Sequence, residues 1–136
     1  MLGAIVGDIV GSRFEFNNHR SMDFDLFTKD CFVTDDSIMT LAVARAIVEA
    51  SKVKAPSNRS GDHDYYALLS DLTVKYMQEI GRKYPGCGFG GMFYRWVFSK
   101  NPKPYNSFGN GAAMRVSAAG FAAKSKSHAE QLAETV

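Results

Sequence analysis

The amino-acid sequence predicts an all-α fold, a helical bundle, on three observations. Apolar residues recur at steps of three and four along most of the chain. No segment keeps the alternation of apolar and polar residues that is typical of a half-buried strand. The connections are too short to be domain linkers, and internal repeats are absent. We therefore expect residues 1–136 to form one helical unit.

The first two helices follow from the spacing of small and apolar residues. Residues 1–11 carry Gly3, Gly7 and Gly11 four apart, and on a helix these glycines form a bare stripe where another helix can approach closely. Residues 35–50 keep a helical apolar period throughout, which predicts a long helix.

A polar stretch with Pro and Gly, residues 51–64, predicts an exposed connection. Its last residue, Asp64, is expected to cap the following helix at 65–84. That helix should stop near Pro85, because proline cannot continue it.

Three shorter helices complete the expected fold. An aromatic helix lies within 88–99, and a turn-rich loop at 100–111 separates it from a small-residue helix at 112–124 and a capped helix at 127–136. The aromatic helix carries a stripe that is interpreted most simply as a core face, made of Phe89, Met92, Phe93, Trp96 and Val97.

Composition and charge exclude several classes of function. The chain is 46% hydrophobic and 22% charged, as in soluble globular proteins, and its net charge of +2 is too small to favour direct nucleic-acid binding. It has no basic leader and no apolar run long enough to cross a bilayer, so we expect a cytoplasmic protein with no membrane partner. Cys31 and Cys87 have no metal-binding spacing, so no disulfide framework or zinc site is expected.

Two adjacent carboxylates, Asp35 and Asp36, stand in the stretch "FVTDDSIMT" and need something to compensate their charge. One interpretation is helix capping: Thr34 is a good N-cap, and acidic residues in a first turn each gain roughly 0.3–1 kcal/mol from the helix dipole. The other is a site for Mg²⁺ or Mn²⁺, which prefer oxygen ligands of this kind.

Two further segments carry polar groups in suggestive positions. Asp8 and Glu15 stand seven apart on an otherwise apolar segment and need partners, which could be Arg13 or Arg20. In "YNSFGNGAAMR", residues 105–115, two glycines just before a helix offer backbone N–H groups and the positive end of a dipole. This second segment is either a phosphate cradle or an ordinary loop closing into a helix cap.

Three of these segments together resemble one family. "GAIVGDIVGSRFE", "TDDS" and "SFGNGAAMR" occur in the order and approximate spacing of the ADP-ribosylglycohydrolases, relatives of the dinitrogenase reductase-activating glycohydrolase. The resemblance covers nearly the whole chain, and three ordered motifs are more specific than any one of them.

The resemblance implies a metal-dependent hydrolase that removes ADP-ribose from a modified protein side chain or a small molecule, by cleaving an N- or O-glycosidic bond. By this likeness Thr34, Asp35 and Asp36 match metal ligands of a binuclear magnesium or manganese centre. Glu15 matches a glutamate beside the metals and is the candidate to manage the proton or to stabilise positive charge on the ribose, so the implied catalytic residues are Glu15, Asp35 and Asp36. Asp8 matches a position that is mainly structural.

The resemblance also implies a substrate loop, which would hold the diphosphate and ribose of ADP-ribose. Its residues are Ser107, Phe108, Gly109 and Asn110. Ser107 can donate a hydrogen bond, and the ring of Phe108 can lie against a base or sugar.

The chain departs from the family pattern in one respect. Family members are usually longer and carry a second metal motif, Asp-x-Asp followed by Thr or Ser, whereas no aspartate occurs here after Asp71. The chain therefore resembles the N-terminal half of the fold. Apolar helix faces would then lack their partners, which favours self-association through these faces or marginal stability.

Three functions follow from these observations and stay open at the level of sequence. The first is a hydrolase whose missing metal ligands come from another chain. The second is a module that binds ADP-ribose without catalysis. The third is a structural fragment in which Asp35 and Asp36 only stabilise a helix end.

Overall fold

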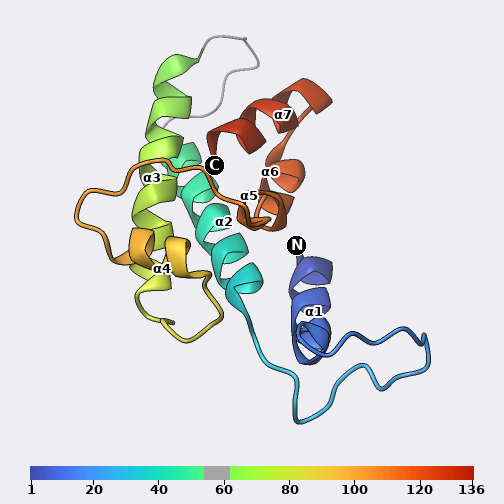
Figure 1. Ribbon diagram of the computed structural model, residues 1–136. Helices are drawn as coiled ribbons and strands as arrows, with labels where there is room; N and C mark the ends of the chain where they lie inside the picture. Colours follow the sequence, from blue (N-terminus) through green and yellow to red (C-terminus); the bar gives the residue numbers. More distant parts are fainter. Residues whose placement is uncertain (54–61) are drawn as a thin grey trace.

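The computed structural model describes residues 1–53 and 62–136, and over these residues the chain is helical with no strand (Figure 1). The all-α prediction is therefore confirmed. The elements in chain order are α1 (Leu2–Gly11), the 3₁₀ turn η1 (Ser12–Phe14), α2 (Asp35–Val53), α3 (His63–Gly81), α4 (Gly91–Phe98), α5 (Gly111–Met114), α6 (Ser117–Ala122) and α7 (Lys126–Thr135).

An antiparallel pair of long helices, α2 and α3, forms the centre of the fold (Figure 1). The apolar period of α2 faces α3 on one side and α6 on the other, so most of its small and aliphatic residues are buried, whereas Leu41 and Val48 are exposed. The core between the elements is formed by Ile38, Met39, Ala42, Val43, Ala46, Ile47, Ala50, Tyr65, Leu69, Tyr76, Met77, Ala118, Ala119 and Leu132. Small residues on α2 let the neighbouring helices approach, and this packing supplies most of the helix stability.

Polar side chains fix α4 against the C-terminal end of α3. The amide nitrogen Nε2 of Gln78 donates to the backbone oxygens of Trp96 and Ser99, each at 3.0 Å. Nε of Arg82 donates to the oxygen of Val97 at 2.9 Å. These bonds bind carbonyl groups at the end of α4, where Trp96 O also accepts the N–H of Ser99. They hold this short helix in one orientation.

The first helix, α1, contacts α2 near the start of that helix and is otherwise set apart from the bundle (Figure 1). At Gly3, Gly7 and Gly11 an added Cβ would meet no heavy atom within 4 Å. The expectation of a close helix contact along this glycine stripe is therefore wrong for the part of the chain that the structure describes. Instead, Gly7 and Gly11 line the cleft described below.

The end of α1 is tied to the long loop that leads to α2. The hydroxyl of Ser12 donates to Ile9 O at 2.9 Å and accepts the N–H of Phe32 at 3.0 Å. Arg13 donates to the hydroxyl of Thr28 at 2.9 Å and to the backbone oxygen of Asp25. The loop is therefore held by specific bonds on the side where it joins the site.

Several boundaries differ from the sequence prediction for local reasons. Asp62, not Asp64, is the N-cap of α3, because its side chain accepts the N–H of Tyr65. The helix expected at 112–124 is broken into α5 and α6. The predicted connection 51–64 lies partly outside the described residues, which omit 54–61.

The break between α5 and α6 has a physical cause in side-chain hydrogen bonds. Nη1 of Arg115 donates to Gly111 O at 3.0 Å, and the hydroxyl of Thr40 donates to Met114 O at 3.3 Å. Side chains thus occupy two carbonyl groups that a continuous helix would bind with its own N–H groups.

Candidate functional site

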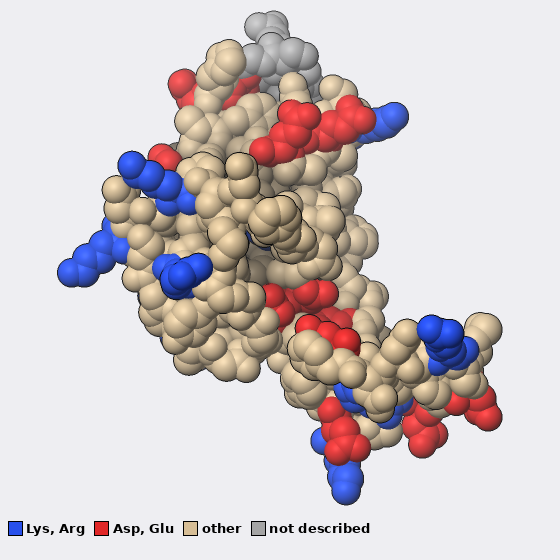
Figure 2. All heavy atoms as spheres, viewed as in Figure 1, with Lys and Arg blue, Asp and Glu red and all other residues tan. Residues whose placement is uncertain are grey.

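A single open cleft brings the sequence-predicted site residues together. Its volume is about 1160 Å³, which exceeds the roughly 300–1,000 Å³ of ordinary small-molecule pockets. Residues of α1, α2, α3, α4 and the loop before α5 line it. Figure 2 shows acidic side chains gathered in a hollow where α1 and the start of α2 meet.

The two carboxylates of Asp35 and Asp36 lie at the N-terminal end of α2 and line this cleft. The backbone N–H of Asp35 donates to Cys87 O at 2.8 Å, so the loop before α4 is fixed against this helix end. The next residue, Gly88, has φ +110°, and a Cβ there would lie 3.2 Å from Oδ1 of Asp35. Glycine at this position is therefore required both by the backbone conformation and by the nearby carboxylate.

Asp8 caps α2 from another helix. Its Oδ2 accepts the backbone N–H groups of Thr34 at 3.0 Å and of Ser37 at 3.2 Å. Its Oδ1 accepts the hydroxyl proton of Thr34. The alternative in which Asp8 pairs with Arg13 is wrong, because Arg13 is engaged with the loop at Asp25 and Thr28.

Burial and neighbouring negative charge raise the pKa values of Asp35 and Asp36. Burial, followed by the charge of Asp36, raises the pKa of Asp35 to about 6, and the charges of Glu15 and Asp8 contribute further. Burial and the charge of Asp8 also raise the pKa of Asp36. No ion pair joins either residue to a basic side chain in the part of the chain that the structure describes. The negative charge at this helix end is therefore only partly compensated by the helix dipole.

Cys87 lies half-buried beside these carboxylates. Burial and the charge of Asp35 raise the pKa of its thiol to about 11. The thiol therefore stays protonated at neutral pH and is a poor nucleophile.

Glu15 follows the η1 turn and is exposed at the edge of the same cleft. Its distance from Asp35 is short enough for its charge to affect that residue. Among the described residues, however, no three His, Cys, Asp or Glu side chains lie close enough together to form a metal site by themselves. A cation here would need the Thr34 hydroxyl, water or another chain to complete its ligands.

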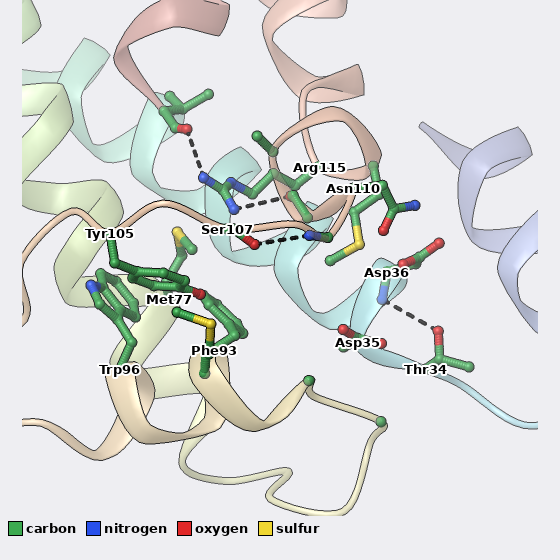
Figure 3. A pocket seen from close by; sticks show the side chains of 18 of the residues that line it. Thr34, Asp35, Asp36, Met77, Phe93, Trp96, Tyr105, Ser107, Asn110 and Arg115 are labelled. Atoms are coloured by element: carbon green, nitrogen blue, oxygen red, sulfur yellow. Dashed lines mark hydrogen bonds between the residues drawn. The ribbon is translucent and has the colours of Figure 1, made fainter.

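The loop from Tyr105 to Asn110 lies across the cleft from the carboxylates. Oγ of Ser107 accepts the backbone N–H of Gly109 at 3.1 Å, so the prediction of a free N–H group at Gly109 is wrong (Figure 3). The following helix, α5, has four residues, so the positive end of its dipole is weaker than the sequence suggested. The hydroxyl proton of Ser107, the fully exposed ring of Phe108 and the exposed side chain of Asn110 are groups of this loop that can contact a ligand.

An aromatic wall, formed by Phe93, Trp96 and Tyr105, lines the cleft on the side away from the carboxylates (Figure 3). The rings of Phe93 and Trp96 are stacked, with centroids 5.4 Å apart and planes 12° apart. The core-face interpretation of the aromatic stripe holds for buried Val97 and in part for Phe89, Phe93 and Trp96, which pack against the core. Phe93 and Trp96 also line the cleft, and Met92 is exposed there. The stripe is wide, with four of its five residues on the eight-residue α4 and Phe89 just before it. This width was the available signal that the helix contacts both the core and the cleft.

Two basic side chains of the cleft were not singled out from sequence. Arg115 lies partly buried behind the Ser107 loop and donates to Gly111 O and Val136 O, while Lys103 is exposed at the rim. Burial lowers the pKa of Arg115 from its ordinary value. The cleft therefore carries negative charge at one end and positive charge near the middle.

Comparison with known protein families shows which family this chain belongs to. Residues 1–136 match the family model of the ADP-ribosylglycohydrolases over their whole length. The chain belongs to the ADP-ribosylglycohydrolase family. No curated protein and no solved structure matches it in the same comparisons.

Family membership confirms the relationship that the three motifs indicated, and it agrees with the all-α fold. All of the site residues that the resemblance implied line one cleft: Glu15, Thr34, Asp35, Asp36, Ser107, Phe108, Gly109 and Asn110. Within the described ranges, no helix of this ADP-ribosylglycohydrolase relative is long and apolar enough to span a bilayer.

Proposed function

We propose that this chain is a divalent-metal-dependent hydrolase that removes ADP-ribose from a modified protein side chain or a small molecule. The observation that carries the proposal is the shared cleft: uncompensated carboxylates at the start of α2 face a loop suited to a diphosphate. Family membership supports the reaction class.

The donor set fits a hard divalent cation. Asp35 and Asp36 supply carboxylate oxygens, Thr34 supplies a hydroxyl oxygen, and no basic side chain of the described residues competes for the pair. Mg²⁺ and Mn²⁺ prefer such ligands, and Mg²⁺ usually keeps several waters, so two carboxylates and a hydroxyl are a reasonable share from one chain. When bound, the metal would lower the pKa of a water molecule and orient the ribose hydroxyls.

Other residues of the cleft would transfer the proton and bind the diphosphate. Glu15 is exposed, and its side chain accepts no hydrogen bond from the described residues. Its carboxylate is therefore available to accept a proton from the attacking water or to stabilise positive charge on the ribose ring. Ser107 would donate its hydroxyl proton to a phosphate oxygen, since its own oxygen already accepts from Gly109. Lys103 at the rim adds positive charge for the diphosphate.

The aromatic wall would hold the nucleoside end of the ligand. In Figure 3 the loop runs from Tyr105, beside Trp96, to Asn110, above Asp36. A ligand with its diphosphate at Ser107 and its reacting ribose at the carboxylates would therefore place its other end over the wall. Stacking of a base on an aromatic side chain contributes roughly 1–3 kcal/mol.

The test combines metal binding with turnover. Calorimetric titration with Mg²⁺ and Mn²⁺ should show binding by the wild type and none by the Asp35→Asn, Asp36→Asn double variant. Asp71→Asn, an exposed aspartate of α3 outside the cleft, is the matched control and should bind as the wild type does. Release of ADP-ribose from arginine-linked and serine-linked substrates should require the metal.

Ligand binding separates hydrolysis from the two other functions. Asn110→Ala should weaken ADP-ribose binding, and Asn101→Ala, an exposed residue earlier in the same loop and outside the cleft, should not. If the chain binds ADP-ribose but releases none from the modified substrates, it is a binding module and not a hydrolase. If the chain binds neither metal nor ADP-ribose, it is a structural fragment in which Asp35 and Asp36 only stabilise a helix end.

A further inference from the structure

The side chain of Asp8 binds the N-terminal end of α2 and the residue before it. Its two oxygens accept three hydrogen bonds: the backbone N–H groups of Thr34 and Ser37 and the hydroxyl proton of Thr34. Ser37 is the third residue of α2, and its N–H is the group that the N-cap side chain of a helix ordinarily binds. Asp8 therefore shares the capping of α2 with Thr34, whose own hydroxyl oxygen accepts the N–H of Asp36.

The consequence for Thr34 follows from counting its hydrogen-bonding groups. A hydroxyl has one proton to donate and two lone pairs to accept with. The proton of Thr34 goes to Asp8, and one lone pair accepts the N–H of Asp36 at 3.3 Å. The second lone pair has no partner among the described residues, although Thr34 is only 6% exposed. The hydroxyl thus already makes two hydrogen bonds and keeps one further lone pair.

The residue that carries this lone pair belongs to the proposed cation site. Thr34 lines the cleft together with Asp35 and Asp36. If Asp8 did not accept the hydroxyl proton, the hydroxyl could rotate and lose its fixed orientation. Loss of a hydrogen bond that orients a metal-binding side chain commonly lowers metal affinity by roughly 10–100-fold.

We propose that Asp8 is a positioning residue for the metal site: by accepting the hydroxyl proton of Thr34, it leaves one lone pair of Thr34 Oγ1 as a ligand for a divalent cation. This inference rests on the proposed function, because it assigns a role toward the same cation. It goes beyond the structural role that the resemblance implied for Asp8.

Asp8→Asn separates positioning from capping. The side-chain oxygen of the amide can still accept the N–H groups of Thr34 and Ser37, so most of the cap is kept. The amide nitrogen then replaces Oδ1 and donates to the Thr34 hydroxyl in place of accepting from it. The lone pair that would bind the cation is consumed, while the helix end stays capped.

The experiment is a titration with Mn²⁺, read by the electron paramagnetic resonance signal of the free ion, with thermal melting of each variant in chelator as a separate readout. Asp8→Asn and Thr34→Val should each lower Mn²⁺ affinity at least about tenfold. Thr34→Ser keeps the hydroxyl and should retain the affinity. The Asp8→Asn, Thr34→Val double variant should bind no more weakly than Thr34→Val alone, because both changes remove the same ligand.

The failure of this inference differs from the failure of the proposed function. If the wild type binds Mn²⁺ and Asp8→Asn binds it equally well, or if the two changes add in the double variant, Asp8 has only a structural role and the inference is overturned. If the wild type binds no Mn²⁺, the proposed metal-dependent function fails, and the inference with it. Melting in chelator shows that each variant compared is folded.

Discussion

Asp35→Asn should stabilise the metal-free protein, although it removes a residue of the proposed active site. The ionised carboxylate is held beside Asp36 without a basic partner in the described chain, and its pKa is raised from 3.8 to about 6. A group whose pKa is raised on folding binds its proton more tightly in the folded state, so it costs stability once the pH exceeds that pKa. Asparagine has nearly the same shape and never ionises.

The magnitude follows from the size of this shift. Each pKa unit corresponds to about 1.36 kcal/mol, so a rise from 3.8 to about 6 sets a ceiling of about 3 kcal/mol. Asp35 is only half-buried, and solvent screening reduces the cost to about 1–2 kcal/mol. We expect Asp35→Asn to raise the melting temperature at about pH 7.5 by roughly 3–8 °C in chelator.

Thermal melting in chelator across a pH series is the assay. Between pH 3.8 and about 6 the Asp35 contribution should make the wild type less stable as pH rises, and this contribution should be missing in Asp35→Asn. The exposed Asp71→Asn variant should follow the wild type. An Asp35→Asn variant no more stable than the wild type above the raised pKa would refute the electrostatic account of the site.

Three other substitutions test the packing and the cleft. Gly88→Ala should cost about 1–2 kcal/mol in denaturant unfolding, because alanine is strained at φ +110°, whereas Gly86→Ala, with open space around it, should cost less. Leu69→Ala should lower the free energy of unfolding by about 2–5 kcal/mol, since this side chain is fully buried between the helices; a loss below 1 kcal/mol would contradict the core assignment. Trp96→Ala should weaken ADP-ribose binding about tenfold or more in calorimetry. The control Phe98→Ala, on α4 but outside the cleft, should bind ADP-ribose as the wild type does. If Trp96→Ala binds ADP-ribose as tightly as Phe98→Ala does, the aromatic wall is not part of the ligand site.

The sequence by itself determined the helices and the family. Apolar period and capping residues are local properties, so they predicted α2, α3, α4 and α7 within a few residues. The three ordered motifs indicated the ADP-ribosylglycohydrolase relationship before any geometry was known. Adjacent Asp35 and Asp36 raised the question of charge compensation from sequence alone, because neighbouring residues are close in any fold.

Only the tertiary structure decided how the site is assembled. Nothing local predicts that Asp8 caps a helix that begins 27 positions later, at Asp35, or that Thr40 takes the carbonyl of Met114 and interrupts a helix. A helical period shows which residues share a face, and the surroundings of that face depend on which elements pack against it. Phe93 and Trp96 therefore became a cleft wall, and the glycines of α1 an open surface, because long-range packing places the neighbouring elements elsewhere.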